Sequence, residues 1–480
     1  MNTKTIIGLE IHVELATKTK MFCGCANEFG AIPNTNVCPV CLGHPGALPV
    51  MNKRAVELAL TAGMAFNCQI DRNQKMDRKK YFYPDLTKGY QITQYDKPFA
   101  KEGYVELSNG KKIGLIEIHM EEDTGKSNHD EDGKVLMDYN RAGVPLIEIV
   151  TKPEMNSPEE AREFVETLAS NLRFLGVSDC IMAEGSMRCD VNINIVDLDN
   201  NIKTNIAEIK NINSIKAIEN ALEYEQKRQI ELLAKGETGV KETRRWDDEL
   251  LETVHMRLKE TGNDYRFAID GDIPEISISE EYLKEIKDKI PELPKDKLQR
   301  YINDYKMSEY DASQLANDRE LAGLFEKTNQ IVNDPKITAN WILSELSRRL
   351  NETEKSPSTM QLSVENFAKL INLAKDNKIN NNVAKKLLRD IFESNEDPEK
   401  LAKERNLLQI SDSNFLASIV DEVLSENKES IDDIKNGKDR AFGYLVGQAM
   451  KKTKGKGNPQ EINALLKEKI GELEWISLLF

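Results

Sequence analysis

The feature that most constrains the fold is a strict alternation of apolar and other residues from 7 to 15. The odd-numbered positions are all apolar, and the even-numbered ones are Gly8, Glu10, His12 and Glu14. A period of two is typical of a β-strand, whose successive side chains point to opposite faces of a sheet. The segment therefore predicts a strand with one buried face and one face that carries three ionisable groups about 7 Å apart.

The charged face of this strand has two interpretations. Alternation of this kind usually marks an antiparallel strand with one face in solvent. Two carboxylates that flank an imidazole also repel each other unless a partner strand or a cation neutralises them, so the same face suits a metal ion. Residues 7–15 alone leave both interpretations open.

Other carboxylates favour the metal. Glu148 lies inside the apolar run 144–150, where an unpaired ionised carboxylate is costly. Residues 119–123 form an acidic corner after a predicted strand, and residues 188–194 place Arg188, Asp190 and two asparagines on one polar face. Mg²⁺ prefers oxygen ligands, and an imidazole beside them also suits Mn²⁺. We therefore expect a divalent metal site.

The chain has no standard phosphate-binding loop. Gly125-Lys126-Ser127 follows a predicted strand, but Met120 stands where the Walker motif requires glycine. Any nucleotide must therefore bind to another scaffold, and we assign Arg188 and Lys126 to the cofactor. The other basic candidates for phosphate or carboxylate contacts are residues 78–80, Lys88, Arg141, Arg244 and Arg245.

Four cysteines occur as two close pairs. Cys23 and Cys25 are followed after twelve residues by Cys38 and Cys41. Two pairs separated by a loop predict a closed tetrahedral zinc site with a structural role. The alternatives are unrelated buried thiols or a redox pair at Cys38 and Cys41.

Composition limits the class of protein and its division into domains. The net charge of −15 over 480 residues argues against a nucleic-acid coat or a peripheral membrane protein. We expect no signal peptide and no membrane span, hence a cytoplasmic protein. Two prolines near residue 292 mark a change to helical spacing, which predicts an α+β body, a helical domain and a small helical tail.

The tail carries a local excess of positive charge. Between residues 435 and 456 seven basic residues face one acid, Asp439. Contacts to phosphates dominate affinity for nucleic acid, so this segment predicts RNA binding, with a lysine-rich solvated loop as the alternative. The basic residues are Lys435, Lys438, Arg440, Lys451, Lys452, Lys454 and Lys456.

Long motifs in one order along nearly the whole chain resemble the B subunit of the aspartyl/glutamyl-tRNA amidotransferases (GatCAB). They lie at residues 7–15, 77–85, 119–127, 140–150, 184–192, 210–214, 242–245 and 442–448. The resemblance implies a mostly antiparallel, glutamine-synthetase-like cradle over 1–292, a helical domain over 293–406 and a YqeY-like tRNA-binding tail over 407–480. It also implies a heterotrimer with an amidase, the A subunit, and with a small C subunit. The implied reaction uses ATP and Mg²⁺ to form an acyl phosphate on misacylated tRNA, which ammonia then converts to an amide.

The resemblance also implies roles for individual residues. Lys79, Lys88 and Asp190 would act along the ammonia path, and Glu14 becomes a structural acid. The implied Mg²⁺ ligands are Glu10, His12, Glu122 and Glu148.

One implied ligand conflicts with the alternation of its strand. Alternation places Glu121, not Glu122, on the face of His119. We keep Glu122 on the expectation that the chain leaves the strand near Met120. Residues 264–271 depart from the family pattern, so we do not carry the family's contacts over to this segment. A carboxylate–amine ligase of small substrates and a tRNA-binding scaffold remain as alternative functions.

Overall fold

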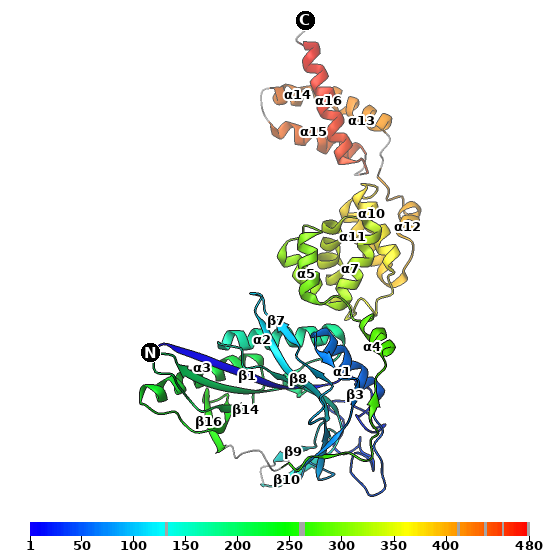
Figure 1. The fold of residues 1–480 in the computed structure, drawn as a ribbon. Helices are drawn as coiled ribbons and strands as arrows, with labels where there is room; N and C mark the ends of the chain where they lie inside the picture. Colours follow the sequence, from blue (N-terminus) through cyan, green and yellow to red (C-terminus); the bar gives the residue numbers. More distant parts are fainter. Residues whose placement is uncertain (130–132, 259–264, 410–412, 436–438, 454–455, 478–480) are drawn as a thin grey trace. The chain divides into compact units, whose positions relative to one another are not determined.

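The computed structural model describes residues 1–129, 133–258, 265–409, 413–435, 439–453 and 456–477. The chain divides into two compact units, Met1–Leu293 and Pro294–Phe480. Strands dominate the first unit and helices form the second, so the predicted α+β class is confirmed (Figure 1). Among the described helices, none is both long and apolar enough to cross a membrane.

The first unit is built on an eleven-stranded sheet whose described pairs are antiparallel except for one, β14 with β15. Along the main path the order is β16-β15-β14-β12-β1-β11-β8-β6-β2. Strands far apart in the sequence therefore lie next to the central strand. The strands are β1 (Thr3–Glu14), β2 (Gln69–Ile70), β6 (Ala100–Lys101), β7 (Tyr104–Glu106), β8 (Lys112–Glu122), β11 (Pro145–Thr151), β12 (Met187–Asp197), β13 (Ile202–Lys203), β14 (Ala207–Lys210), β15 (Glu242–Asp247) and β16 (Glu252–Leu258).

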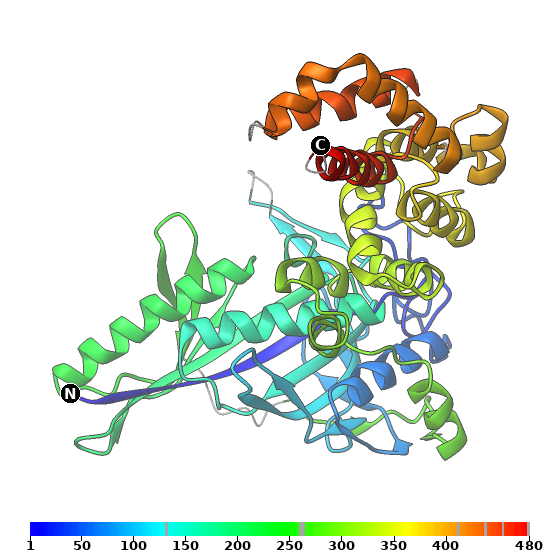
Figure 2. The same ribbon diagram turned by 90° about the horizontal axis from the view of Figure 1, so that it is seen from above.

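The apolar face of β1 forms the core of this unit. Ile7, Leu9, Ile11 and Val13 are almost completely buried, as the alternation predicts. The helices α1 (Lys53–Ala65), α2 (Pro158–Leu175) and α3 (Ile215–Ala234) run along one side of the sheet (Figures 1 and 2). Their apolar side chains join the same hydrophobic cluster as β1. The charged face of β1 is therefore left on the side away from the helices.

Local signals fix the ends of α2. The Ser157 hydroxyl accepts a hydrogen bond from the backbone N–H of Glu160, and Pro158 begins the helix. Gly176 ends the helix in the left-handed conformation at φ 69°, which glycine adopts without steric cost.

Small sheets and a helix complete the first unit. They are β3 (Asn73–Gln74) with β18 (Ile276–Ser277), β4 (Asp77–Lys80) with β5 (Tyr90–Thr93) and β17 (Ala268–Ile269), β9 (Lys126–His129) with β10 (Val135–Asp138), the short helix Met182–Glu184, and α4 (Glu280–Lys287).

The segment after Arg266 is anchored. The Phe267 ring stacks on Tyr95 with centroids 3.8 Å apart. Arg78 donates from Nε to the fully buried carboxylate of Asp270 at 2.8 Å. The departure from the family pattern thus still gives a strand that pairs with β4, although Asp264 lies outside the described residues.

The described residues of the second unit form two separate hydrophobic clusters, whose buried members lie between 301 and 402 and between 416 and 470. The change to helical spacing predicted near residue 292 is confirmed, because the described elements from Pro294 onward are helical. The predicted domain boundary at 406/407 stays a prediction. The helices are α5 (Pro294–Asn303), α6 (Glu309–Ala316), α7 (Arg319–Val332), α8 (Pro335–Asn340), the π-helical turn Trp341–Leu346, α9 (Ser347–Glu352), α10 (Val364–Lys375), α11 (Asn381–Ser394), α12 (Pro398–Glu404), α13 (Ser413–Glu426), α14 (Lys428–Lys435), α15 (Asp439–Lys452) and α16 (Pro459–Ser477).

Candidate active site

Strand register brings charged residues of four strands into one row across the sheet. His12 of β1 lies opposite Arg188 of β12 on one side and opposite Glu148 of β11 on the other. Glu148 in turn lies opposite His119 of β8. Directly opposed residues in an antiparallel pair are about 5 Å apart, so the row places acid and imidazole side chains in contact.

In this row and the neighbouring one, imidazole side chains lie between carboxylates. His12 Nε2 lies 3.3 Å from Glu121 Oε1 and 3.4 Å from Glu148 Oε2. His119 Nε2 lies 3.0 Å from Glu148 Oε2, and its Nδ1 lies 3.5 Å from Glu117 Oε1. We call these five residues the acidic cluster. The cluster holds three carboxylates and two imidazoles, and each of them contacts at least one other member.

Positive charge stabilises the carboxylates of the acidic cluster. Burial lowers the pKa of His12, but hydrogen bonds to Glu121 and Glu148 outweigh it and raise the pKa to about 10. His119 behaves in the same way, with hydrogen bonds to Glu117 and Glu148 and a pKa of about 10. Burial alone raises the pKa of Glu148, yet hydrogen bonds from His119 and His12 hold it well below its usual range. A divalent cation neutralises the same carboxylates.

The donor set fits such an ion. One ligand atom from each of His12, Glu121 and Glu148 can be chosen so that all three lie within 4.8 Å of one another. Two carboxylates with one imidazole suit Mg²⁺ or Mn²⁺. Glu10 lies two residues before His12 on the same face of β1, where it accepts a hydrogen bond from Asn192 Nδ2 at 3.0 Å.

The position expected for Glu122 is corrected. The strand β8 does not end near Met120 but continues to Glu122, which pairs with Pro145. The alternation therefore holds, and Glu121 takes the place beside His12. The carboxylate of Glu122 points to the other face, where it accepts hydrogen bonds from Lys88 and from the backbone N–H of Ile92.

Two arginines, Arg188 and Arg141, and the carboxylates of Asp123 and Glu14 lie beside the acidic cluster. Arg188 donates from Nη2 to Asp123 at 2.7 Å, while its buried Nε has no hydrogen-bond partner among the described residues. Arg141 Nε lies 3.4 Å from the same carboxylate. Burial raises the pKa of Glu14 to about 7, and the negative charge of Asp123 acts in the same direction. The free Nε of Arg188 is suited to an anionic ligand.

The other predicted residues are less closely grouped. Lys88 is nearly buried against Glu122, and Lys79 Nζ lies 4.8 Å above the Tyr265 ring. Asp190 forms an ion pair with Lys210. Lys126 is exposed on β9, in a separate two-stranded sheet.

Two arginines proposed for phosphate have partners within the protein. Arg244 is held by Glu242 and by the fully buried Glu225. Arg245 lies 3.0 Å from Asp247 and is half exposed. Arg244 therefore has a structural role between β15 and α3.

The ligand set expected from the sequence left out three members of the acidic cluster, although alternation had placed Glu121 on the face of His119, and one partner was missed. Glu117, His119 and Glu121 occupy every second position of β8, and that period was the available signal. Lys210 faces Asp190 because β14 pairs with β12 in a register that the sequence did not reveal.

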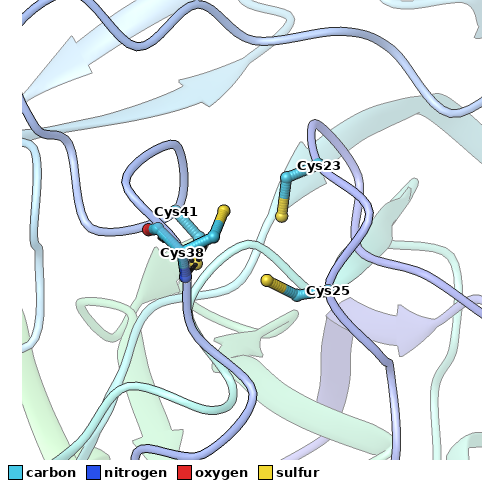
Figure 3. A group of neighbouring side chains, drawn as sticks. All are labelled: Cys23, Cys25, Cys38 and Cys41. Atoms are coloured by element: carbon cyan, nitrogen blue, oxygen red, sulfur yellow. Dashed lines mark hydrogen bonds between the residues drawn. The ribbon is translucent and has the colours of Figure 1, made fainter.

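The four predicted zinc ligands converge. Cys23 and Cys25 lie on one loop and Cys38 and Cys41 on another, and the two pairs face each other across a small space (Figure 3). Their sulfur atoms all lie within 4.8 Å of one another. All four are free thiols, as are the other cysteines of the chain. A redox pair needs two sulfurs, whereas a tetrahedral metal site uses all four.

A buried lysine adds positive charge at this cysteine cluster. Lys20 is completely buried, and its Nζ lies 3.7 Å from Cys41 Sγ and 3.3 Å from the Tyr139 carbonyl oxygen. A hydrogen bond from Cys23 is the main cause that lowers the pKa of Cys41 to about 4, and the charge of Lys20 also lowers it. These contacts favour the thiolate of Cys41, the form that binds metal. Burial raises the pKa of Cys25 to about 11, and a hydrogen bond to Cys41 raises that of Cys23.

The basic segment of the tail is partly neutralised by its own bundle. Lys452 lies 2.6 Å from Glu422 and 2.8 Å from Glu426, both on α13. Arg440 and Lys451 are exposed, and Lys456 is half-buried. Lys438 and Lys454 lie outside the described residues, as does the side chain of Lys435.

Comparison with known proteins gives consistent matches. Residues 5–284 match the model of the GatB/GatE catalytic domain, and residues 323–470 match that of the GatB domain. The chain is 58% identical over 473 residues to the B subunit of the aspartyl/glutamyl-tRNA(Asn/Gln) amidotransferase of Finegoldia magna, covering 98% of this chain and all of the relative. It is 46% identical to the protein of the same name from Clostridium tetani and 47% identical to that from Caldicellulosiruptor saccharolyticus, with the same coverage.

Proposed function

Since this chain belongs to the GatB/GatE family of amidotransferase B subunits, we propose that it carries out tRNA-dependent transamidation. Its substrates are Glu-tRNA(Gln), Asp-tRNA(Asn) or both, and its products are the corresponding Gln-tRNA(Gln) and Asn-tRNA(Asn). It works in a heterotrimer with an amidase, the A subunit, which releases ammonia from glutamine, and with a small C subunit. Residues 407–480 bind the tRNA.

The observation that carries this proposal is the acidic cluster with Arg188 beside it. Activation of a carboxylate by ATP brings several negative charges together, so the site must position and neutralise them. His12, Glu121 and Glu148 supply a donor set for one divalent ion, Mg²⁺ in this proposal, with Glu10 on the same face. When bound, that ion neutralises charge on the phosphates.

The reaction has two steps. An oxygen of the aminoacyl carboxylate attacks the γ-phosphorus of ATP, the bond to the β-phosphate oxygen breaks, and ADP leaves. Arg188 has a free N–H beside the acidic cluster, which orients the carboxylate for this attack. Arg188 thus acts by holding the anion in place.

In the second step ammonia attacks the acyl carbon, and phosphate leaves with the electrons of the C–O bond. The attacking nitrogen must then lose a proton. Asp190 accepts it in this proposal, held in place by Lys210 at the edge of β14. Lys79 and Lys88 line the approach of ammonia, where a positive charge disfavours a second cation and so favours neutral ammonia over ammonium.

Zinc has no step in this chemistry. Four cysteine ligands close the coordination shell, so a zinc ion there is structural. It ties the loop 23–41 to the strand that precedes it. Lys88 links the residues just after this loop to the end of β8, because its side chain packs at Gly43 and binds Glu122.

The test is transamidation by the assembled heterotrimer. Glu148→Gln should abolish formation of Gln-tRNA and Asn-tRNA with either glutamine or ammonium chloride as nitrogen source, while glutamine hydrolysis by the complex persists. Glu166→Gln, an exposed acid on α2, is the matched control and should keep full activity. Normal product formation by Glu148→Gln would refute the assignment of the acidic cluster. ATP consumption that is equal with and without charged tRNA would instead indicate a ligase of small substrates.

A further inference from the structure

Lys79 keeps a positive charge that no carboxylate compensates. Within the described part of the chain its Nζ forms no ion pair and no hydrogen bond, although the side chain is half-buried. Of the two lysines assigned to the approach of ammonia, Lys79 is therefore the one whose charge is still available to a ligand. Three other half-buried lysines of the first unit each pair with an acid: Lys75 with Asp77 and Asp96, Lys88 with Glu122, and Lys210 with Asp190.

Two aromatic rings hold the ammonium of Lys79. Its Nζ lies 4.8 Å from the centroid of the Tyr265 ring and 5.9 Å from that of the Tyr81 ring. The two rings are 6.0 Å apart and meet edge to face at 74°. The face of a ring attracts a cation through its quadrupole, but it adds no net negative charge. Lys79 is thus held in place while its charge persists and its N–H groups can turn to another acceptor.

Tyr265 is itself fixed by residues before and after it in space. The backbone N–H of Lys80 donates to the Tyr265 carbonyl oxygen at 2.8 Å, which places this residue beside β4. The ring of Phe267 lies 6.1 Å from that of Tyr265 and stacks on Tyr95. This segment departs from the family pattern, so the resemblance did not imply a contact between Tyr265 and Lys79.

Tyr81 connects the pair of rings to the acidic cluster. Burial raises the pKa of the Tyr81 hydroxyl, and the negative charges of Glu121, Asp85 and Asp123 act in the same direction. Glu121 belongs to the acidic cluster. The ring beside Lys79 therefore lies within the electrostatic field of the acidic cluster.

The charge of Lys79 affects the form of nitrogen that can arrive. Most ammonia in neutral water is ammonium, and an acidic cluster attracts that cation as it attracts a metal ion. A positive charge near the carboxylates repels ammonium, whereas its N–H groups can donate to the lone pair of neutral ammonia. A carboxylate partner would cancel the charge of the lysine, but an aromatic ring does not. The rings thus fix the position of Lys79 and preserve its charge.

We propose that Tyr265 is a positioning residue for transamidation, whose ring holds the uncompensated ammonium of Lys79 where it admits neutral ammonia and repels ammonium. The inference rests on the proposed function, which assigns Lys79 to the approach of ammonia. It adds a residue that acts through Lys79. It predicts that the ring and the absence of charge at position 265, rather than the tyrosine hydroxyl, decide how well ammonia is used.

Four substitutions at position 265 separate these features. Tyr265→Phe keeps the ring and removes the hydroxyl, and Tyr265→Leu removes the ring from a side chain that is 41% exposed. Tyr265→Glu and Tyr265→Gln have the same shape, and only the first supplies Lys79 with a counter-ion. Tyr104→Leu is the matched control, because it breaks the same kind of contact with Lys112, whose Nζ lies 4.1 Å from the Tyr104 ring.

The assay is transamidation of charged tRNA by the assembled heterotrimer with ammonium chloride as nitrogen source. Tyr265→Leu should raise the KM for ammonium chloride about fivefold, and Tyr265→Glu should raise it more than Tyr265→Gln does. Tyr265→Phe and Tyr104→Leu should stay within about twofold of the parent. The KM for ATP and glutamine hydrolysis by the complex should not change in the position-265 variants.

An unchanged KM for ammonium chloride in Tyr265→Leu would overturn the proposal. An equal rise in the KM for ATP, or the same loss in Tyr265→Phe, would also overturn it, because general loss of structure or the hydroxyl would then explain the effect. If Tyr265→Leu lowers the melting temperature, the comparison of Tyr265→Glu with Tyr265→Gln decides, and equal KM values for that pair overturn the proposal.

Lys79→Met separates this inference from the function on which it rests. It should lower kcat/KM for ammonium chloride at least about tenfold. That loss together with a normal Tyr265→Leu variant would overturn the inference alone. A normal Lys79→Met variant would refute the role of Lys79 in the proposed function, and the inference with it.

Discussion

Replacing Lys20 with methionine should weaken zinc binding without unfolding the zinc-free protein. Lys20 is completely buried and its Nζ lies 3.7 Å from Cys41 Sγ. Zinc with four thiolates carries a double negative charge, which this ammonium partly balances. Methionine keeps the length and apolar character of the side chain and removes only the charge.

The size of the effect follows from the geometry. One pair of unit charges 3.7 Å apart contributes about 4 kcal/mol at an effective dielectric constant of about 20. Hydrogen bonds to charged groups contribute about 1.5–3 kcal/mol net, because burial of the charges offsets part of the attraction. We therefore expect a loss of about 3 kcal/mol, or roughly a hundredfold increase in the zinc dissociation constant.

The assay is competition for zinc between the protein and a chromophoric chelator, with Lys18→Met as the matched control because Lys18 is exposed on the same loop. The control should bind zinc like the unaltered chain. The melting temperature of the zinc-free Lys20→Met variant should equal or exceed that of the zinc-free parent, since a buried charge has been removed. Zinc affinity within threefold of the parent would show that Lys20 does not stabilise the site.

Three further outcomes test other parts of the chain. Arg78→Met leaves the fully buried Asp270 without its arginine and should cost about 3–5 kcal/mol in chemical denaturation, of which adding Asp270→Asn should restore a part. Burial alone raises the pKa of Glu326, but hydrogen bonds from Lys297, Arg300 and Tyr301 hold that pKa below 4.5. The ionised carboxylate therefore stabilises the fold above pH 4.5, and this stabilisation is lost as the pH falls through the pKa of Glu326 in the folded protein. Glu326→Gln should therefore lower the melting temperature at pH 7, with an effect that shrinks as the pH falls below 4.5, and an effect that does not change with pH would contradict the assignment. Deletion of residues 407–480 should raise the KM for tRNA about tenfold at low salt and leave glutamine hydrolysis unchanged, whereas an unchanged KM would exclude the tail from tRNA binding.

The sequence alone determined the faces of the strands and the cysteine cluster. Side-chain direction alternates along every strand, so the buried and charged sides of β1 follow from neighbouring residues. The same local rule placed Glu121 on the face where the structure has it, beside His12, whereas the ligand implied by the resemblance, Glu122, lies on the other face. The cysteine cluster was also predicted from the sequence, because a short loop keeps both cysteine pairs within reach of one ion.

Only the tertiary structure decided which charged residues meet. Glu121 and Glu148 lie more than a hundred residues after His12 in the sequence, and their contact with it depends on strand order and register. A shift of one residue in that pairing would move each side chain to the opposite face. Register is set by packing of the whole sheet on its helices, not by the sequence near each residue. The resemblance had implied that His12 and Glu148 share one ion, but the contact of Glu148 with His119 was not predicted from the sequence.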